Sequence, residues 1–296
     1  HLEQDVKRAV ASATSAMPRV MDGYPHRTAL LFLDPLAGKS EEATALAAEL
    51  LGQDVTLAGG ASGDDLKMNE TQLSLGHLVA SNAMALVVLY TKTPVGVGVG
   101  LGHRVFNASP MRVTRAEGSI VYEVDGRPAW NAWLEAGRGQ PVGQDEVAAM
   151  AVDDITRFLL SYEGAFRSGN EVRVRSPLRR DPNGALDFFC PIPVGTEICV
   201  TEQSADAQME NALQAARMAK AELGGMAVSG ALVFDCTCRT ITLGNRFDEA
   251  VRGISAELGT VPLAGFGTYG EIGGSRAAGP GFHNNATVVL AFGNGA

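Results

Sequence analysis

Two short glycine-rich segments end in acidic residues, and their carboxylates are the groups best placed for chemistry in this sequence. Asp64 and Asp65 close the segment 58–65, and Glu271 closes the segment 265–271. Carboxylates at such turns can pair with the cation of a ligand, while turn amides can hold its anion. A small zwitterion of the amino-acid type would satisfy both kinds of group.

Other candidate binding residues follow strand-like runs elsewhere in the chain. Asp125 adds a further carboxylate for the ligand's cation, whereas Arg127 and Arg239 offer guanidinium groups to its anion. Side chains near the second glycine-rich segment can add hydrogen bonds. The candidate ligand-binding residues are Asp64, Asp65, Asp125, Arg127, Cys236, Arg239, Tyr269, Glu271, His283 and Asn284.

Cys236 and Cys238 follow an apolar run, a place where α/β proteins often put binding residues. Arg239 beside them could lower a thiol pKa, and Cys236 as nucleophile with His283 as base would make an enzyme if the two met in space. Buried cysteines that act as small apolar side chains are the simpler interpretation. We therefore predict no catalytic residues and a protein that is not an enzyme.

Two histidines raise the question of a cofactor. His103 or His283 could be the axial ligand of a haem, or could simply make hydrogen bonds. Neither has a closely spaced second ligand, and the four cysteines lack paired CxxC spacing. The sequence therefore predicts no metal site and implies no cofactor by itself, with haem as the alternative.

Two further motifs match known binding or catalytic patterns only in part. Residues 265–270 match GxGxxG, but the glycine-rich stretch 271–281 that follows cannot be the helix that a dinucleotide site requires. Residues 60–63, which include Ser62, resemble a GxSxG nucleophile elbow superficially and fit a tight turn better.

Charge and composition exclude several classes of protein. The 296-residue chain has a formal net charge of −9, which disfavours nucleic acid as a partner. The one compact arginine cluster, within residues 173–180, has acidic neighbours and predicts a solvated strand edge or turn. The first residues do not read as a signal peptide, and no apolar run is long enough to span a membrane, so we expect a cytoplasmic protein.

The elements that must position these residues form a repeat. A strand at 28–33, a helix at 40–51 with Ser40 as its N-cap, and a strand from residue 55 into the acidic turn make a β-α-β unit. A strand at 231–234, a helix at 246–258 and the strand and turn at 261–271 follow the same order. The chain therefore contains two related halves, which indicates a duplication.

The region between the halves has patterns of its own. Val and Gly alternate in 94–102, and glycine in a strand usually marks the close approach of another backbone or of a ligand. Trp130 and Trp133 suit a core-facing helix stripe. Further helices are predicted at 6–20, 127–134, 145–160 and 206–223, with a linker at 137–143.

Helices interleaved with strand pairs predict an α/β fold, with a mixed α+β arrangement as the alternative. Each half should contain a β-α-β unit and additional, mostly antiparallel strands. The linker predicts two domains, residues 1–137 and 138–296.

Together these segments resemble the FIST domain, which is found in bacterial signalling proteins and in some eukaryotic F-box proteins. The resemblance implies a partial FIST N-like domain at 1–137 and a FIST C-like domain at 138–296. On this comparison we expect the chain to begin after the strand-helix unit that usually opens the family pattern, as a truncated form or a stand-alone sensor would. It rests on segments 30–32, 58–65, 113–116, 124–129, 234–239, 265–271 and 283–287.

What the resemblance implies is a sensor. Such a protein would bind a small, amino-acid-like molecule and pass its occupancy to a downstream signalling protein. Some bacterial members resemble haem-based nitric-oxide sensors, so a haem-binding gas sensor is one alternative. A protein-interaction scaffold without a ligand is the other.

Overall fold

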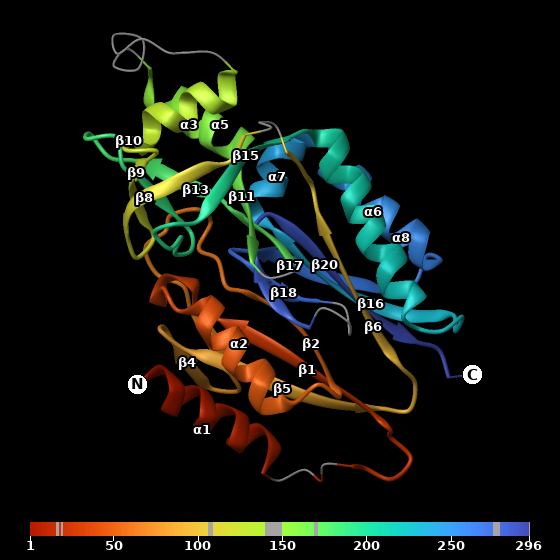
Figure 1. The fold of residues 1–296 in the computed structure, drawn as a ribbon. Helices are drawn as coiled ribbons and strands as arrows, with labels where there is room; N and C mark the ends of the chain where they lie inside the picture. The colour runs from red at the N-terminus through yellow and green to blue at the C-terminus, as the bar shows by residue number, and fades with distance from the viewer. Residues whose placement is uncertain are drawn as a thin grey trace. The chain divides into compact units, whose positions relative to one another are not determined.

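The computed structural model describes residues 1–15, 18, 20–105, 109–139, 150–168, 171–274 and 279–295. The chain forms two compact units, drawn as a ribbon in Figure 1. The first unit joins residues 1–101 to residues 209–296, and the second contains residues 102–208. These units are defined by contacts in space, and the first contains two separate segments of the chain. They therefore do not test the predicted boundary between two sequence domains at residue 137, which remains a prediction.

The first half of the first unit is the predicted β-α-β unit. β1 and β2 run parallel, and β5 pairs antiparallel with the other edge of β1. The sheet order is β19-β18-β2-β1-β5, so two strands from the second half complete it. The elements are α1 (Leu2–Thr14), β1 (His26–Leu33), η1 (Pro35–Ala37), α2 (Ser40–Leu51), β2 (Val55–Ala61), β3 (Leu73–Leu75), β4 (Leu78–Ala80) and β5 (Met84–Thr91).

The second half repeats this arrangement. β16 and β17 run parallel, and β20 pairs antiparallel with β16. The sheet order is β17-β16-β20-β6, so β6 from the first half closes it. Besides β6 (Val95–Leu101), the elements are α6 (Ala205–Ala221), β16 (Val228–Cys236), α7 (Thr237–Leu243), η2 (Gly244–Arg246), α8 (Phe247–Leu258), β17 (Leu263–Thr268), β18 (Glu271–Gly273), β19 (Gly281–His283) and β20 (Ala286–Gly293).

Matching glycines confirm the repeat in atomic detail. Gly59 of β2 lies opposite Leu31 of β1, and Gly265 of β17 lies opposite Val233 of β16. A Cβ atom would stand 1.9 Å from the Leu31 carbonyl oxygen at the first position and 2.1 Å from that of Val233 at the second. Both halves therefore need glycine at the same place, and the prediction of two related halves in an α/β fold is confirmed.

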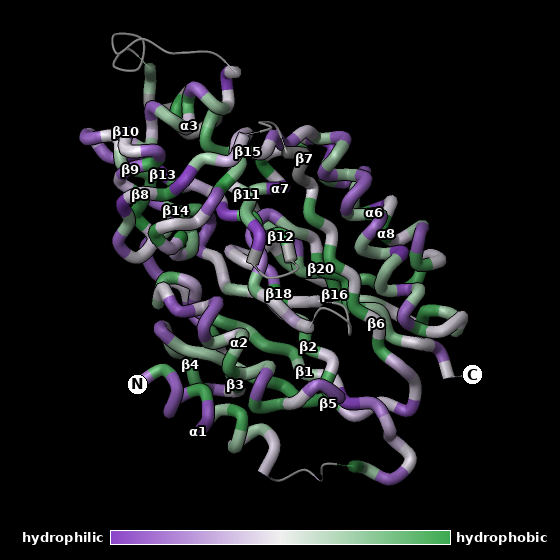
Figure 2. The backbone as a smooth tube through the Cα atoms, viewed as in Figure 1, coloured by the Kyte–Doolittle hydropathy of each residue, from purple (hydrophilic) through white to green (hydrophobic). Residues whose placement is uncertain are grey.

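The two sheets of the first unit pack face to face. Phe32 of β1 meets Phe234 of β16 edge-on, with ring centroids 6.1 Å apart. In Figure 1, α1 and α2 lie outside one sheet, and α6 and α8 lie outside the other. Apolar colour follows much of β1 and β6 in Figure 2, while α6 and α8 alternate between polar and apolar positions. The core thus lies between the sheets and beneath the helices.

The glycines of β6 allow the backbone of α6 to pack closely against this strand. A Cβ atom at Gly98 would stand 1.9 Å from the carbonyl oxygen of Ala215, and one at Gly96 would stand 2.0 Å from that of Ala219, both in α6. The prediction that alternating glycine marks the close approach of another backbone is therefore confirmed.

The second unit is built on a nine-stranded sheet with the order β12-β11-β15-β8-β9-β14-β13, to which β10 and β7 add at β9 and β15. Trp130 and Trp133 are buried in its core, as predicted, and the Trp133 indole N–H donates to the carbonyl of Tyr162 (3.0 Å). The elements are β7 (His103–Val105), β8 (Met111–Glu117), β9 (Ile120–Val124), β10 (Arg127–Pro128), α3 (Ala129–Arg138), α5 (Val152–Ser161), β11 (Tyr162–Ser168), β12 (Glu171–Arg175), β13 (Pro177–Arg180), β14 (Leu186–Phe188) and β15 (Glu197–Gln203).

Several predicted helix boundaries differ from those in the structure: the helix expected at 127–134 is α3 (Ala129–Arg138), and the one expected at 206–223 is α6 (Ala205–Ala221). α1 spans Leu2–Thr14 instead of 6–20, and α5 begins at Val152 instead of 145, although 145–149 lie outside the described residues, as does most of the predicted linker. Ser40 is not the N-cap of α2, because Ala43 N–H already bonds to Lys39 O and makes Lys39 the cap.

The arginine cluster was expected to be solvated, and this is wrong for Arg175. Its side chain is 1% exposed, lies over the Phe166 ring at 5.5 Å and donates to the Val174 carbonyl (2.9 Å). Burial lowers the pKa of this guanidinium. Contact with an aromatic face offsets part of the cost of burying the cation.

Candidate functional site

The two glycine-rich turns lie against each other. Glu271 of β18 pairs in register with Gly60 of β2. The N–H of Ala61 donates to the carbonyl of Gly270 (2.7 Å), and the carbonyl of Ala61 accepts from the N–H of Tyr269 (3.2 Å). The sequence showed only that the two segments are alike. Their contact brings Asp64, Tyr269 and Glu271 to one region of the first unit.

Asp64 organises its own turn. Its carboxylate accepts backbone N–H groups of Met68 (2.9 Å), Asn69 (2.7 Å) and Glu70 (3.1 Å), and the Tyr269 hydroxyl (2.7 Å). These hydrogen bonds, that of Asn69 foremost, hold the pKa of Asp64 well below its ordinary value. The carboxylate is therefore engaged in fixing the loop after β2.

Three other predicted residues lie at the protein surface. Asp65 has a side chain 94% exposed and faces Lys67 at 4.0 Å. In the second unit, Asp125 accepts the backbone N–H of Arg112 (2.8 Å), and Arg127 pairs with Glu135 (2.7 Å). Asp125 and Arg127 thus belong to a different unit from Asp64 and Glu271.

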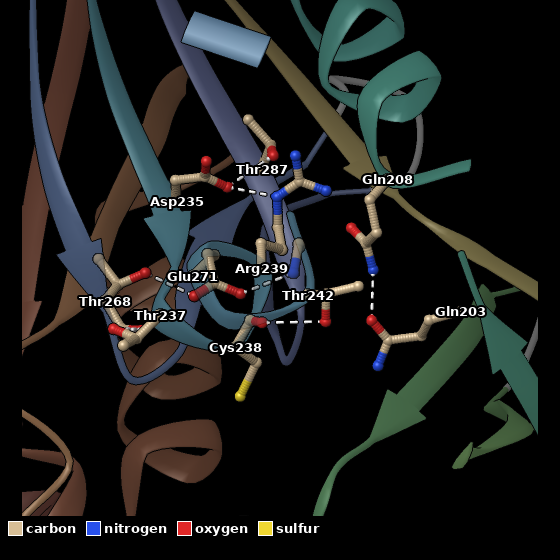
Figure 3. Close-up of polar contacts among 11 residues, drawn as sticks. Gln203, Gln208, Asp235, Thr237, Cys238, Arg239, Thr242, Thr268, Glu271 and Thr287 are labelled. Carbon is tan, nitrogen blue, oxygen red and sulfur yellow. Dashed lines mark hydrogen bonds and ion pairs between the residues drawn. The ribbon is translucent and has the colours of Figure 1, made fainter. Parts of the chain in front are cut away.

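A buried ion pair lies where β16 ends and α7 begins. Arg239 Nε donates to Asp235 Oδ1 (2.5 Å), and Thr287 Oγ1 donates to the same oxygen (2.7 Å), as Figure 3 shows. Asp235 is 5% exposed, and Arg239 and Thr287 are fully buried. Arg239 thus has a carboxylate partner inside the protein. Asp235 was not among the predicted site residues, although its position at a strand end in the repeat could have indicated it.

Glu271 is a buried acid beside this pair. It is 0% exposed, and its carboxylate accepts a hydrogen bond from the Thr268 hydroxyl (2.5 Å), drawn in Figure 3. The N–H of Ala286 also donates to this carboxylate (3.0 Å). Burial, and then the neighbouring Cys236 and Asp235, raise the pKa of Glu271 well above its ordinary value. A carboxyl group in this environment favours its neutral form.

Two of the remaining predicted residues, Cys236 and His283, lie next to this acid. Cys236 is 4% exposed, at the end of β16. His283, paired in register with Glu271, makes a ring-nitrogen hydrogen bond with Gly273 O (2.9 Å), and the amide of Asn284 donates to His283 O (3.3 Å). His103 lies in β7, and its side chain is outside the described part of the chain. The ligand, haem and thiol roles of these residues remain predictions.

The two weaker motifs have structural roles. β17 runs directly into the turn before β18, so the stretch after GxGxxG continues as a strand where a dinucleotide site needs a helix. Ser62 donates its hydroxyl to the Leu33 carbonyl (3.2 Å), as expected of a residue in a tight turn.

A cavity at the other end of β1 and β2 was not predicted from the sequence. It has a volume of about 610 Å³ and lies where these strands begin and α2 ends. Its charged lining side chains are Arg27, Glu49, Asp54 and Glu222, and Arg27 forms an ion pair with Asp54. Only the fold brings Glu222, near the end of α6, to residues so distant in sequence.

The second unit holds a cavity of its own, of about 730 Å³. Its lining includes Phe166, Val172 and the side chain of Cys199, whose pKa is raised mainly by burial. This thiol therefore favours its neutral and less reactive form.

The described residues contain neither a membrane-spanning helix nor a cluster of metal-binding side chains. Among them, no helix combines the length and apolarity needed to cross a membrane. The same residues contain no group of three His, Cys, Asp or Glu side chains arranged to hold a metal ion.

Known proteins resemble this chain at the level of sequence. An uncharacterized protein of Mycobacterium tuberculosis is 28% identical over 256 residues, which cover 85% of this chain and 64% of that protein. One from Mycobacterium bovis is 28% identical over 218 residues, or 73% and 55% of the two chains. The chain thus spans less than two thirds of these relatives.

A solved structure of 2C-methyl-D-erythritol 2,4-cyclodiphosphate synthase from Plasmodium vivax matches with 17% identity over 45% of this chain and 93% of that chain. The TM-score of this match is 0.15, which does not indicate a shared fold. Two family models match this chain. The FIST N domain matches residues 1–127 and the FIST C domain matches residues 130–274. The chain therefore belongs to the FIST family.

Proposed function

We propose that this protein binds an amino-acid-like small molecule in the cavity at the start of β1 and β2, and passes its occupancy to a downstream signalling protein. FIST domains are sensory domains of signal-transduction proteins. The observation that carries the proposal is a ligand-sized cavity whose wall contains both a guanidinium group and carboxylates.

Size and charge both suit such a ligand. A volume of about 610 Å³ lies within the usual range for small-molecule sites. The Arg27 side chain is 13% exposed and shares its ion pair with Asp54, which leaves further N–H donors for a ligand carboxylate. Glu49 and Glu222 offer acceptors for an ammonium group.

The make-up of the cavity wall supports the proposed transmission of occupancy. Arg27, Glu49 and Asp54 come from the first half of the repeat, whereas Glu222 and Pro280 come from the second. A ligand that touches both halves stabilises one arrangement of them over another. The shift in population is limited by the difference in its affinity for the two arrangements.

A thermal-shift screen of the twenty amino acids tests the proposal. A binder should raise the melting temperature in a concentration-dependent way. Arg27→Gln should abolish that rise, and the control Arg8→Gln, on the exposed face of α1, should keep it. A rise that survives Arg27→Gln, or no rise with any amino acid, would contradict the proposed site.

A further inference from the structure

We infer that β17 is a docking edge for a second copy of this chain, and that two copies pair antiparallel through it about a twofold axis at Gly265. β17 (Leu263–Thr268) lies at one end of the sheet order β17-β16-β20-β6, and no described strand pairs with its outer edge. Four successive residues of the strand, 264–267, are exposed. Such a dimer does not depend on the proposed ligand.

The backbone groups of β17 alternate between β16 and the open edge. The two strands run parallel with Leu263 opposite Ala231, and the N–H of Ala231 donates to the carbonyl of Pro262 (3.0 Å). In a parallel ladder, alternate residues of a strand turn their N–H and C=O groups to the same neighbour. The N–H and C=O groups of Leu263, Gly265 and Gly267 therefore point away from β16.

This edge has none of the features that usually prevent strand pairing. The strand contains no charged residue and no proline, and its register with β16 runs without a bulge. Phe266 is 43% exposed, and its ring lies beside those of Phe32 (6.2 Å) and Phe234 (5.7 Å). A strand added to this edge would cover the exposed part of an aromatic cluster that belongs to the core.

The first half of the repeat shows what the matching edge accepts. β2 is the counterpart of β17, with Gly59 at the position of Gly265. Gly59 and Gly60 pair antiparallel with Ile272 and Glu271 of β18, and Ile272 is fully buried there. The edge of β2 thus takes an antiparallel strand, whereas that of β17 has none among the described residues.

A second β17 fits this edge in register. When Gly265 of one chain faces Gly265 of the other, Leu263 faces Gly267, so that all the outward N–H and C=O groups bond in pairs. Phe266 of each chain then faces Ala264 of the other, and a large side chain meets a small one at two equivalent places. The strand is therefore complementary to itself, without like charges across the axis.

Analytical ultracentrifugation of charged edge variants tests the dimer. The wild type should sediment as a dimer and Ala264→Lys as a folded monomer, because lysine at an exposed edge position opposes strand pairing. Val87→Lys is the matched control on β5, the edge strand of the other sheet, and should remain a dimer. Mixing Ala264→Lys with Ala264→Glu should restore a dimer, because the two side chains lie diagonally across the axis.

Hydrogen exchange followed by NMR tests the strand pairing itself. The N–H groups of Gly265 and Gly267 should be protected in the wild-type dimer and lose this protection in Ala264→Lys, whereas the N–H of Phe266, directed at β16, should stay protected in both. A monomeric wild type, or a dimer lost in Val87→Lys but kept in Ala264→Lys, would overturn the inference. A dimer in which Gly265 and Gly267 exchange freely would overturn it as well.

Discussion

The two halves of the repeat use their acidic turns in opposite ways. In the first half, Asp64 is surrounded by hydrogen-bond donors, and its pKa is lowered. In the second half, Glu271 is fully buried with two donors, and its pKa is raised. The same turn thus stabilises a charged carboxylate in one copy and a neutral one in the other, depending on donors and burial.

The carboxylates at the carboxyl end of the first strand of each half show a similar contrast. Asp34 after β1 accepts the N–H of Leu36 (3.0 Å) and hydrogen bonds from Thr71 and Asn82, so neutral donors satisfy it. Asp235, at the end of β16, is paired with the buried cation Arg239. The two halves therefore share a backbone arrangement, while only the second has a buried ion pair at this position.

The largest expected effect comes from breaking that cluster. Arg239→Ala leaves Asp235 buried without its cation, which should lower the free energy of unfolding by about 3–5 kcal/mol. Urea denaturation measures this loss. As a control, Arg179→Ala removes an exposed ion pair with Asp187 and should cost less than about 1 kcal/mol. Equal losses in the two variants would contradict the assigned role of the buried pair.

The repeat itself can be tested at its matching glycines. Gly59→Ala and Gly265→Ala each push a Cβ atom into a strand backbone, so each should cost about 1–3 kcal/mol in urea denaturation. Gly230→Ala is the control, because its Cβ would meet nothing closer than 3.4 Å. A large loss at only one of the two matched positions would show that the halves differ in backbone packing.

The smallest effects concern pH, and the two turns should respond with opposite signs. The lowered pKa of Asp64 gives stability that is present above its ordinary value of 3.8 and lost as the pH falls. The raised pKa of Glu271 makes the wild type lose stability as the pH rises above 4.5 towards the folded-state value.

Melting temperatures between pH 3 and pH 8 test both signs. The melting temperature of Asp64→Asn should lie furthest below that of the wild type at neutral pH and closest to it in acid. The melting temperature of Glu271→Gln should increase relative to that of the wild type as the pH rises. If the melting temperatures of the two variants, relative to the wild type, changed with pH in the same direction, the opposite pKa shifts of Asp64 and Glu271 would be contradicted.

The sequence predicted the repeat well, because strand and helix periodicity and glycine positions are local signals. It predicted the glycines of β6 as a place of close approach, and the structure identifies α6 as the neighbour. It could not show that the Asp64 carboxylate accepts hydrogen bonds from three backbone N–H groups of its own loop, because these bonds depend on the path of the chain after β2. The cavity escaped prediction because Glu222 meets Arg27 and Glu49 only through tertiary packing.

A crystal structure of the protein grown with the amino acid that raises its melting temperature most tests the central claim most directly. The account predicts electron density for that amino acid in the cavity at the start of β1 and β2, with its carboxylate near Arg27. The same amino acid bound instead at the paired turns around Asp64 and Glu271, or an empty cavity at saturating concentration, would contradict it.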